Sequence, residues 1–156
     1  MKIKLVALLV ALAIGGLGAS MGWAQGGSHV MVTPGDLKWQ DVPSLPAGAK
    51  MAVIEGPPNQ AVPFTFRLKF PADYKVPAHS HPAIEHATVI SGTLNMGMGD
   101  KLDPTKTTPL SAGSVAIMPA RANHFAWVKE ETIVQVHGIG PWGVIWVNPA
   151  DDPMKK

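Results

Sequence analysis

The stretch HSHPAIEHATVISG, residues 79–92, holds three of the chain's six histidines and a glutamate within its first eight positions. His79 and His81 are two residues apart, so in an extended segment their side chains leave the same face of the strand. A tight turn at Pro82-Ala83 lets the chain reverse and brings Glu85, at the head of the next strand, back to that side. Two imidazoles and a carboxylate that face inward form most of a site for a first-row metal.

The rest of the chain after residue 60 reads as a series of short strands. Gly, Pro, Asp and Asn separate apolar runs such as VPFTFRLKF (62–70), HATVISG (86–92), TLNMGM (93–98), SVAIMPA (114–120), HFAWV (124–128), TIVQVHGIG (132–140) and WGVIWVNP (142–149). Runs of this length with turn residues between them, and no long stretch of helical period, predict an antiparallel all-β domain. The number of runs suits a small sandwich or barrel.

The N-terminus has the composition of a secretory signal peptide. Lys2 and Lys4 precede an apolar stretch that runs from Leu5 to Leu17, and small residues follow it. We therefore expect residues 1–24 to be a signal peptide that is removed, and the mature protein to be periplasmic or secreted. The apolar stretch is shorter than the roughly 20 residues that a bilayer span needs, so no stable membrane span is expected after cleavage.

The segments that flank the predicted barrel differ from it in composition. Residues 25–60 are rich in Gly, Pro and Ser and predict an extended N-terminal arm with one or two short edge strands. We place the barrel domain at residues 61–150 and a C-terminal tail at residues 151–156.

Charge and cysteine content exclude several kinds of partner and site. Removal of Lys2 and Lys4 with the signal peptide leaves 11 of the 13 basic residues, which balance the 11 acidic residues. No basic run remains, so nucleic acid is not an expected partner. The chain has no cysteine, so disulfides and thiolate metal ligands are excluded and an exported domain must rely on its core.

A second motif lies in GSVAIMPARANHFAW, residues 113–127, where Pro119 precedes His124 at the start of an apolar strand. The spacing His-x-His-x3-Glu-x6-Gly, followed by Gly-x5-Pro-x4-His, resembles the paired motifs of the cupin superfamily. The resemblance covers roughly residues 60–148, and this part of the chain looks like the small, exported, single-domain metal-binding cupins. It implies a double-stranded β-helix, the cupin jelly-roll barrel. The metal ligands that it implies are His79, His81, Glu85 and His124.

Two positions depart from the usual second cupin motif. Arg121 stands two residues after the proline, where the motif usually has glycine. Val128 stands four residues after the histidine, where the motif usually has asparagine. The turn before His124 is therefore expected to differ, while the ligand itself is kept.

Candidate catalytic residues come from the strand-like run IVQVHG. Gln135 and His137 share one face of this strand, and Val134 and Val136 share the other. If the polar face points inward, His137 can act as a general base and Gln135 can orient a substrate or water; if the valines point inward, both polar residues are solvated. We favour the inward orientation, because a polar metal pocket can satisfy these groups. His86 adjoins Glu85 and is expected on the outer face.

The ligand set does not choose one metal or one reaction. A site of three histidines and a carboxylate suits Mn, Fe, Ni, Cu or Zn and leaves up to two positions open for water, dioxygen or a small-molecule ligand. One hypothesis is a metal-dependent enzyme, oxygenase-like or lyase/isomerase-like, that acts on a small oxygen-bearing molecule. The alternatives are a non-catalytic metal or small-ligand binding or sensing module, and a barrel that metal only stabilises. The apolar area of Trp127, Trp142 and Trp146 suits core packing, a pocket wall or a homodimer interface.

Overall fold

The computed structural model describes residues 29–155, and the predicted signal peptide, residues 1–24, lies outside them. The compact unit that carries the strands begins at Val32. Within the described residues, no helix has the length and apolar character needed to cross a membrane.

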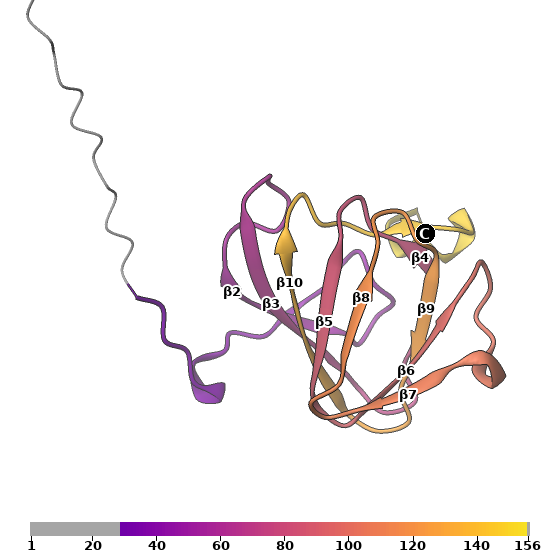
Figure 1. Ribbon diagram of the computed structural model, residues 1–156, viewed down its shortest axis with the longest axis horizontal. Coiled ribbons are helices and arrows are strands. Elements are labelled where there is room, and N and C mark those ends of the chain that lie inside the picture. Colours follow the sequence, from indigo (N-terminus) through magenta and orange to yellow (C-terminus); the bar gives the residue numbers. More distant parts are fainter. Residues whose placement is uncertain (1–28, 156) are drawn as a thin grey trace, which may run out of the picture. The chain divides into compact units, whose positions relative to one another are not determined.

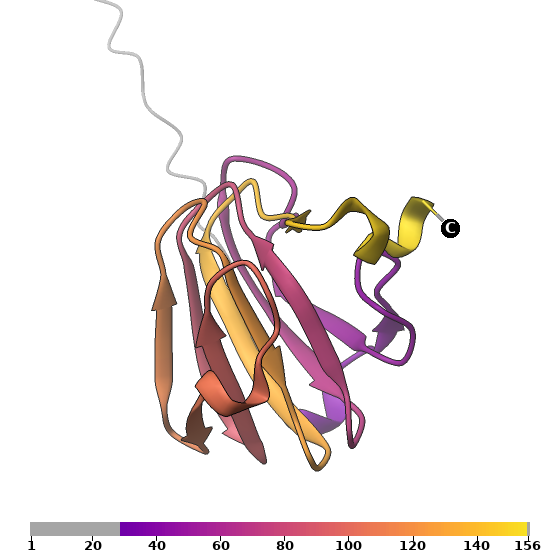
Figure 2. The same ribbon diagram turned by 90° about the vertical axis from the view of Figure 1, so that its right-hand side faces the viewer.

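Two antiparallel sheets make up the compact unit (Figure 1). One sheet has the strand order β1-β2-β3-β10-β5-β8 and the other has the order β11-β4-β9-β6-β7. The sheets face each other across the core, as the turned view shows (Figure 2). The strands are β1 (Gln40–Asp41), β2 (Lys50–Glu55), β3 (Pro63–Phe70), β4 (Lys75–Ser80), β5 (Glu85–Ser91), β6 (Thr93–Met98), β7 (Thr108–Ser111), β8 (Val115–Met118), β9 (His124–Trp127), β10 (Thr132–Ile139) and β11 (Ile145–Trp146). The all-β prediction is confirmed, and the layered arrangement is that of a jelly roll.

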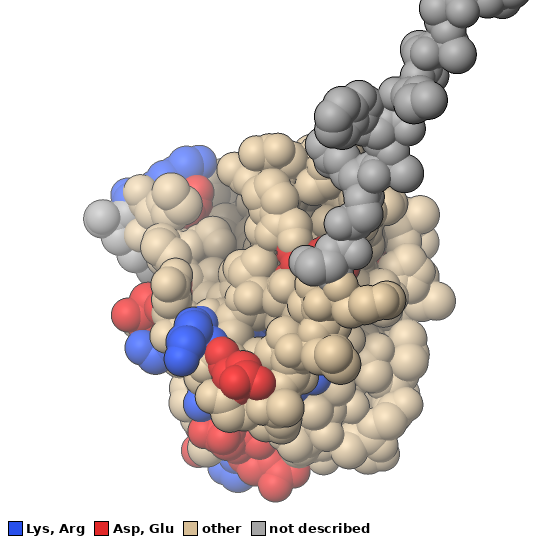
Figure 3. Space-filling model, turned by 90° about the vertical axis from the view of Figure 1, so that its left-hand side faces the viewer, with Lys and Arg blue, Asp and Glu red and all other residues tan. Residues whose placement is uncertain are grey.

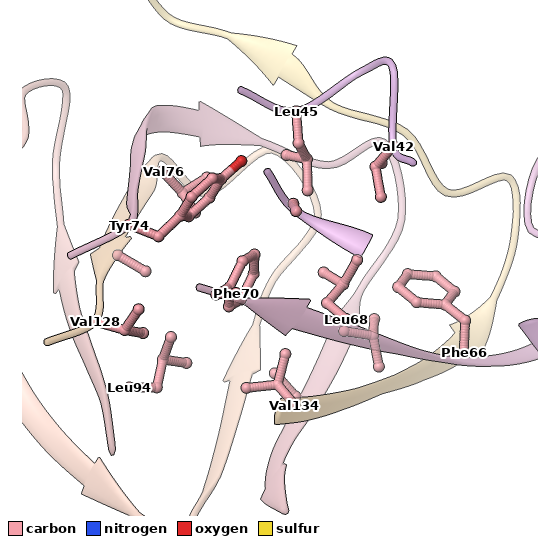
Figure 4. Packing of buried hydrophobic residues seen from close by; sticks show 14 of the residues in the cluster. Val42, Leu45, Phe66, Leu68, Phe70, Tyr74, Val76, Leu94, Val128 and Val134 are labelled. Atoms are coloured by element: carbon pink, nitrogen blue, oxygen red, sulfur yellow. The ribbon is translucent and has the colours of Figure 1, made fainter. Parts of the chain in front are cut away.

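The core follows from the period-2 alternation of the strands. In β3, Phe64, Phe66, Leu68 and Phe70 are buried and the residues between them are not. Figure 4 shows Phe66, Leu68 and Phe70 pointing to the same side as Val134 of the neighbouring β10. Each large apolar side chain buried in this way stabilises the fold by roughly 1.5–3 kcal/mol. Because every second residue of a strand packs in the core, the residues between them must point to the outer face of the sheet.

The N-terminal segment that the sequence predicts as an arm contributes two edge strands. β2 pairs with β3 and β1 pairs with β2, so both extend the larger sheet. Val42, Leu45 and Ala49 between and beside these strands are buried in the core. This part of the chain therefore packs as part of the barrel wall.

The turn between β5 and β6 depends on Gly92, the last residue of the opening stretch. Its φ of +76° lies in the left-handed region, which glycine adopts without a steric penalty. A Cβ atom at this position would lie 2.6 Å from the carbonyl oxygen of Glu131. Both the backbone conformation and the lack of space therefore require glycine here.

Short 3-10 helices lie in the connections and near the C-terminus. They are η1 (Pro34–Asp36), η2 (Pro104–Lys106), η3 (Pro149–Asp151) and η4 (Pro153–Lys155). Asp103 precedes η2, and its side chain accepts a hydrogen bond from the backbone N–H of Thr105. η4 lies within residues 151–156, which were predicted as a C-terminal tail, whereas η3 begins two residues before that segment.

Charged side chains of both signs are mixed on the surface. Figure 3 shows Lys and Arg next to Asp and Glu toward one edge of an otherwise largely uncharged face. Lys50 forms an exposed ion pair with Asp41 at 2.7 Å, and Lys129 forms one with Asp73 at 2.6 Å. Pairs of this kind contribute about 0–1 kcal/mol each, so the core rather than the surface charge holds the barrel together.

Candidate metal centre

The opening stretch and the second motif meet inside the barrel. His79 lies in β4, His81 follows that strand directly, Glu85 begins β5 and His124 begins β9. His79 and His124 are directly opposite each other in the β4–β9 pair. Strand pairing therefore brings together two histidines that lie more than forty residues apart in the sequence.

The three histidines form a compact cluster. One nitrogen from each ring lies within 4.8 Å of the corresponding nitrogens of the other two. The ring centres are 4.3 Å apart for His79 and His124, 4.9 Å for His79 and His81, and 5.1 Å for His81 and His124. All three side chains are buried. Each Zn–N bond is about 2.0–2.1 Å long, so two nitrogens on one ion are about 3–4 Å apart, and small shifts of the rings would let all three imidazoles reach a single ion.

Backbone carbonyl groups fix the tautomer of each ring. The Nδ1 atom of His79 lies 2.7 Å from the oxygen of Pro77, that of His81 lies 2.7 Å from the oxygen of Gly143, and that of His124 lies 2.9 Å from the oxygen of Ala122. A carbonyl oxygen can only accept a hydrogen bond, so each Nδ1 carries the proton. The Nε2 atom of each neutral ring therefore presents a lone pair, and this is the arrangement in which imidazole binds a metal.

The carboxylate of Glu85 lies next to the Nε2 atoms of the histidine cluster. Its Oε2 atom lies 3.2 Å from Nε2 of His81, and that nitrogen is buried without a hydrogen-bond partner. The indole N–H of Trp142 donates a hydrogen bond to the same carboxylate oxygen. Two electron-rich atoms that face each other in a buried site need a cation or a proton between them.

Burial controls the protonation of the whole cluster. It lowers the pKa of His81 to about 4 and lowers the pKa of His79 well below its usual value, with repulsion from the other imidazoles adding to the effect on His79. Burial also lowers the pKa of His124. The pKa of Glu85 is raised by burial, against the opposing effect of the Trp142 hydrogen bond. The imidazoles are therefore neutral near pH 7, as metal binding requires.

The cluster opens onto a cavity of about 40 Å³ with mainly apolar walls. This is more than the roughly 10–15 Å³ that one water molecule needs, so a few water-sized groups fit beside the histidines. Among the residues that line the cavity, the titratable groups are His79, His81, Glu85 and His124. The apolar lining residues are Leu45, Leu68, Phe70, Val76, Ala87, Leu94, Met96, Ala126, Val134, Val136, Trp142 and Val144.

Trp142 has a specific role in the site that no local sequence pattern indicates. Its ring stacks on His81 with the ring centres 5.2 Å apart, and it also contacts the edge of Phe66 at 4.8 Å. Trp146 lies beside His79, with the ring centres 5.5 Å apart. From the sequence, these tryptophans could be interpreted only as apolar surface, because the hydrogen-bond partner of an indole N–H depends on the path of the chain after β10.

Gln135 and His137 do not face the cavity, which corrects the orientation that we favoured from the sequence. Val134 and Val136 are buried and line the cavity, so the alternating residues of β10 lie on the outer face of the sheet. Gln135 accepts a hydrogen bond from Nε of Arg67 at 3.2 Å, and the ring of His137 stacks on that of His86. Burial of the two valines determines which face of β10 points inward. Neither Gln135 nor His137 is therefore positioned for catalysis at the inner site.

The two departures from the second cupin motif have separate structural outcomes. Arg121 adopts a φ of +62°, the left-handed conformation that favours glycine, and its N–H donates to the oxygen of His81 at 2.8 Å. The turn before His124 thus contains a left-handed residue without a glycine. Val128 is buried in the core, and its N–H donates to the oxygen of Tyr74.

Comparison with known proteins identifies the fold. No family model and no curated protein matches the chain. Among solved structures, the polyketide cyclase RemF from Streptomyces resistomycificus matches with a TM-score of 0.66 and 16% identity, covering 82% of this chain and 92% of the cyclase. An RmlC-like cupin from Shewanella frigidimarina matches with a TM-score of 0.56 and 15% identity, covering 70% of this chain and 89% of its own. KdgF from Halomonas sp. matches with a TM-score of 0.53 and 19% identity, covering 71% and 93%.

These similarities define the fold of the protein. The sheets, their order and the likeness to these structures show a cupin fold, as the paired motifs predicted. Within that fold the chain carries a buried cluster of three histidines, which is a candidate divalent metal site.

Proposed function

We propose that the protein is an exported, metal-dependent cupin enzyme that acts on a small oxygen-bearing molecule, with His79, His81, Glu85 and His124 as the metal ligands. The observation that carries the proposal is the buried contact between the Nε2 lone pair of His81 and Oε2 of Glu85 at 3.2 Å. A divalent cation held by these two residues would remove this repulsion and balance the charge of the carboxylate.

The residues of the chain fit such an ion without rearrangement of their hydrogen bonds. Three Nδ1–H groups remain on backbone carbonyls while three Nε2 atoms are free to ligate. Trp142 orients the carboxylate of Glu85 and stabilises its charged form. When bound, a divalent metal would supply Lewis acidity, or oxygen chemistry if it is redox-active Mn, Fe, Ni or Cu rather than Zn.

The cavity walls define the kind of substrate. Because the polar groups that line the cavity are gathered at the histidine cluster, a substrate would place an oxygen-bearing group there and its apolar part against the valine and leucine side chains. The small volume favours a compact molecule. Since Gln135 and His137 face away, the titratable groups on the cavity wall are the four proposed ligands themselves. Glu85 could hold or move a proton there only while its carboxylate is not bound to the metal.

The names of the similar structures support an enzymatic role but do not define the reaction. RemF is a polyketide cyclase, and cyclisation belongs with the lyase/isomerase-like chemistry that we consider beside oxygenase-like chemistry. The second candidate function is a non-catalytic metal or small-ligand binding or sensing module. The absence of a separate base among the lining residues and the cavity of about 40 Å³ favour this alternative.

A spectroscopic experiment separates an accessible site from a closed one. The full-length, untagged chain is loaded with one equivalent of Co²⁺, and its visible spectrum is followed during titration with acetohydroxamate, a compact oxygen chelator. We expect the spectrum to change with saturable binding. Val144→Phe, which adds bulk to the cavity wall, should abolish this change while retaining the metal, and Val144→Ala serves as the matched control. A wild-type spectrum that acetohydroxamate leaves unchanged would favour a metal that only stabilises the barrel.

Turnover then distinguishes an enzyme from a binding module. Small diketones, hydroxy acids and phenols are screened for consumption by the metal-loaded chain under air and under nitrogen. An enzyme should convert at least one compound that perturbs the metal spectrum, and Glu85→Gln should reduce that turnover. Compounds that bind without conversion in both atmospheres would support the binding module.

Export is a separate part of the proposal. The Lys-bearing, apolar N-terminus is the feature that supports it. We expect the mature chain to begin at Gln25 and to be recovered from a periplasmic or secreted fraction. Mass spectrometry of the protein from its native source checks both points, and an intact Met1 in a cytosolic fraction would contradict them.

A further inference from the structure

A second group of polar residues crosses the outer face of the larger sheet. His137 of β10 is directly opposite His86 of β5 on one side and Thr65 of β3 on the other. Thr65 is in turn opposite Glu55 of β2 and donates a hydrogen bond to its carboxylate at 3.1 Å. Strand register thus aligns two imidazoles and a carboxylate on the face that points away from the inner histidine cluster.

The two outer histidines are as close as those of the inner cluster. The rings of His86 and His137 are stacked, with their centres 5.0 Å apart and an angle of 17° between their planes. The corresponding distances within the inner cluster are 4.3–5.1 Å. The outer pair therefore has the spacing at which two imidazoles can reach one ion.

Both outer rings carry a nitrogen that lacks a partner. The Nδ1 atoms of His86 and His137 are withdrawn from solvent, and neither forms a hydrogen bond within the structure. A polar atom that is buried without a partner destabilises the fold, because it has lost its hydrogen bonds to water and gained none in return. Two such atoms lie on directly paired residues of β5 and β10, so both are available to a ligand that enters the space beside the rings.

The space beside the rings can accept that ligand. His86 and His137 line a groove of about 500 Å³ together with Glu55, Thr65 and apolar residues that include Ile84 and Ile139. Glu55 supplies a negative charge at this groove, and the volume leaves room for water or another exogenous ligand. Imidazole nitrogens with a nearby carboxylate suit Zn²⁺, Cu²⁺ or Ni²⁺ better than Mg²⁺ or Ca²⁺.

We propose that His86 and His137 form a second, outer site for a divalent transition metal, with Glu55 as the neighbouring anionic group. Each ring contributes one nitrogen, and rotation of the rings about their Cβ–Cγ bonds brings both nitrogens within about 2.0–2.1 Å of one ion. This site has fewer protein ligands than the inner cluster. It therefore binds more weakly and exchanges with metal in solution.

Calorimetric titration with Zn²⁺ tests the proposal. The full-length, untagged, metal-free chain should bind two equivalents in two separable phases. His137→Ala should weaken the second phase by about 100-fold or more, because it removes one half of a two-point chelate, and should leave the first phase unchanged. His124→Ala should show the reverse pattern. His29→Ala is the matched control for a histidine outside both sites, and it should retain both phases.

A second readout identifies the residues directly. In a long-range ¹H–¹⁵N spectrum of the imidazoles, the second equivalent of Zn²⁺ should shift the signals of His86 and His137 and leave those of His79 and His124 unchanged. Because His86 adjoins Glu85, the His137 variant decides the outcome if His86→Ala disturbs the inner site. A single binding phase in the wild type, a second phase that persists in His137→Ala, or a second equivalent that shifts neither outer ring would overturn the proposal.

Discussion

Replacement of Trp142 by phenylalanine isolates one hydrogen bond of the inner site. The substitution removes the indole N–H that donates to Oε2 of Glu85 and keeps an aromatic ring to stack on His81 and contact Phe66. Without this donor, the pKa of Glu85, which burial already raises, rises further. A proton then competes more strongly with a metal for the carboxylate.

The expected size of this effect follows from the strength of the bond. A hydrogen bond to a charged group contributes about 1.5–3 kcal/mol. With about 1.4 kcal/mol for each tenfold change in affinity, Trp142→Phe should weaken divalent metal binding by roughly 10- to 100-fold. This agrees with the usual cost of removing a residue that hydrogen-bonds to a metal ligand.

Competition titration with a chromophoric chelator at pH 7 measures the change. Trp146→Phe is the matched control, because Trp146 lies beside His79 but forms no hydrogen bond to the carboxylate in the described structure. In a Glu85→Gln background the effect of Trp142→Phe should disappear, as expected when two residues act through one contact. Equal affinities of Trp142→Phe and wild type, or an equal loss in Trp146→Phe, would refute the assigned role of the indole N–H.

Further predictions concern protonation, the anionic ligand and the turn before His124. In the metal-free protein, the unfolded state takes up protons on histidine near pH 6.5 while folded His81 does so near pH 4, so stability falls as the pH is lowered between these values. His81 alone accounts for about 3 kcal/mol of this loss, and the raised pKa of Glu85 opposes part of it. Urea unfolding at several pH values measures the change, and a free energy of unfolding that is the same at pH 7 and pH 4 would contradict a buried neutral cluster. Glu85→Gln should weaken divalent binding because it removes the anionic ligand, and an unchanged affinity would count against Glu85 as a ligand. Arg121→Gly should raise the stability by about 1 kcal/mol, seen as an increase of about 2–4 °C in Tm, because glycine adopts the left-handed conformation without strain. Arg121→Ala keeps that strain, so an equal gain in Arg121→Ala would show that the backbone conformation is not the cause.

Much of the fold and of the candidate site could be predicted because the relevant signals are local. Alternation in VPFTFRLKF reports directly which residues of β3 enter the core. The spacing His-x-His-x3-Glu likewise places three polar groups around one turn, and the resemblance to cupin motifs added His124. The structure brings all four of these residues to the same buried place.

The parts that could not be predicted depend on contacts between distant segments. In β10, polar and β-branched residues alternate, so either face could be buried, and the packing of Val134 and Val136 on the core decided the matter. The hydrogen bond from Trp142 to Glu85 joins residues 57 positions apart, and no local pattern specifies it. The pairing of His86 with His137 likewise depends on the register between β5 and β10.

The most direct test of the central claim is the metal content of untagged protein purified from its native source without added metal. Elemental analysis compares two chains that both carry His137→Ala, which removes the outer site. One chain keeps His124, and the other also carries His124→Ala. We predict about one divalent transition-metal ion per chain when His124 is present. The His124→Ala chain should contain almost none, although it remains folded by circular dichroism. Equal metal content in the two chains, or a metal-free chain with His124 intact, would contradict the assignment of the inner histidine cluster as a metal centre.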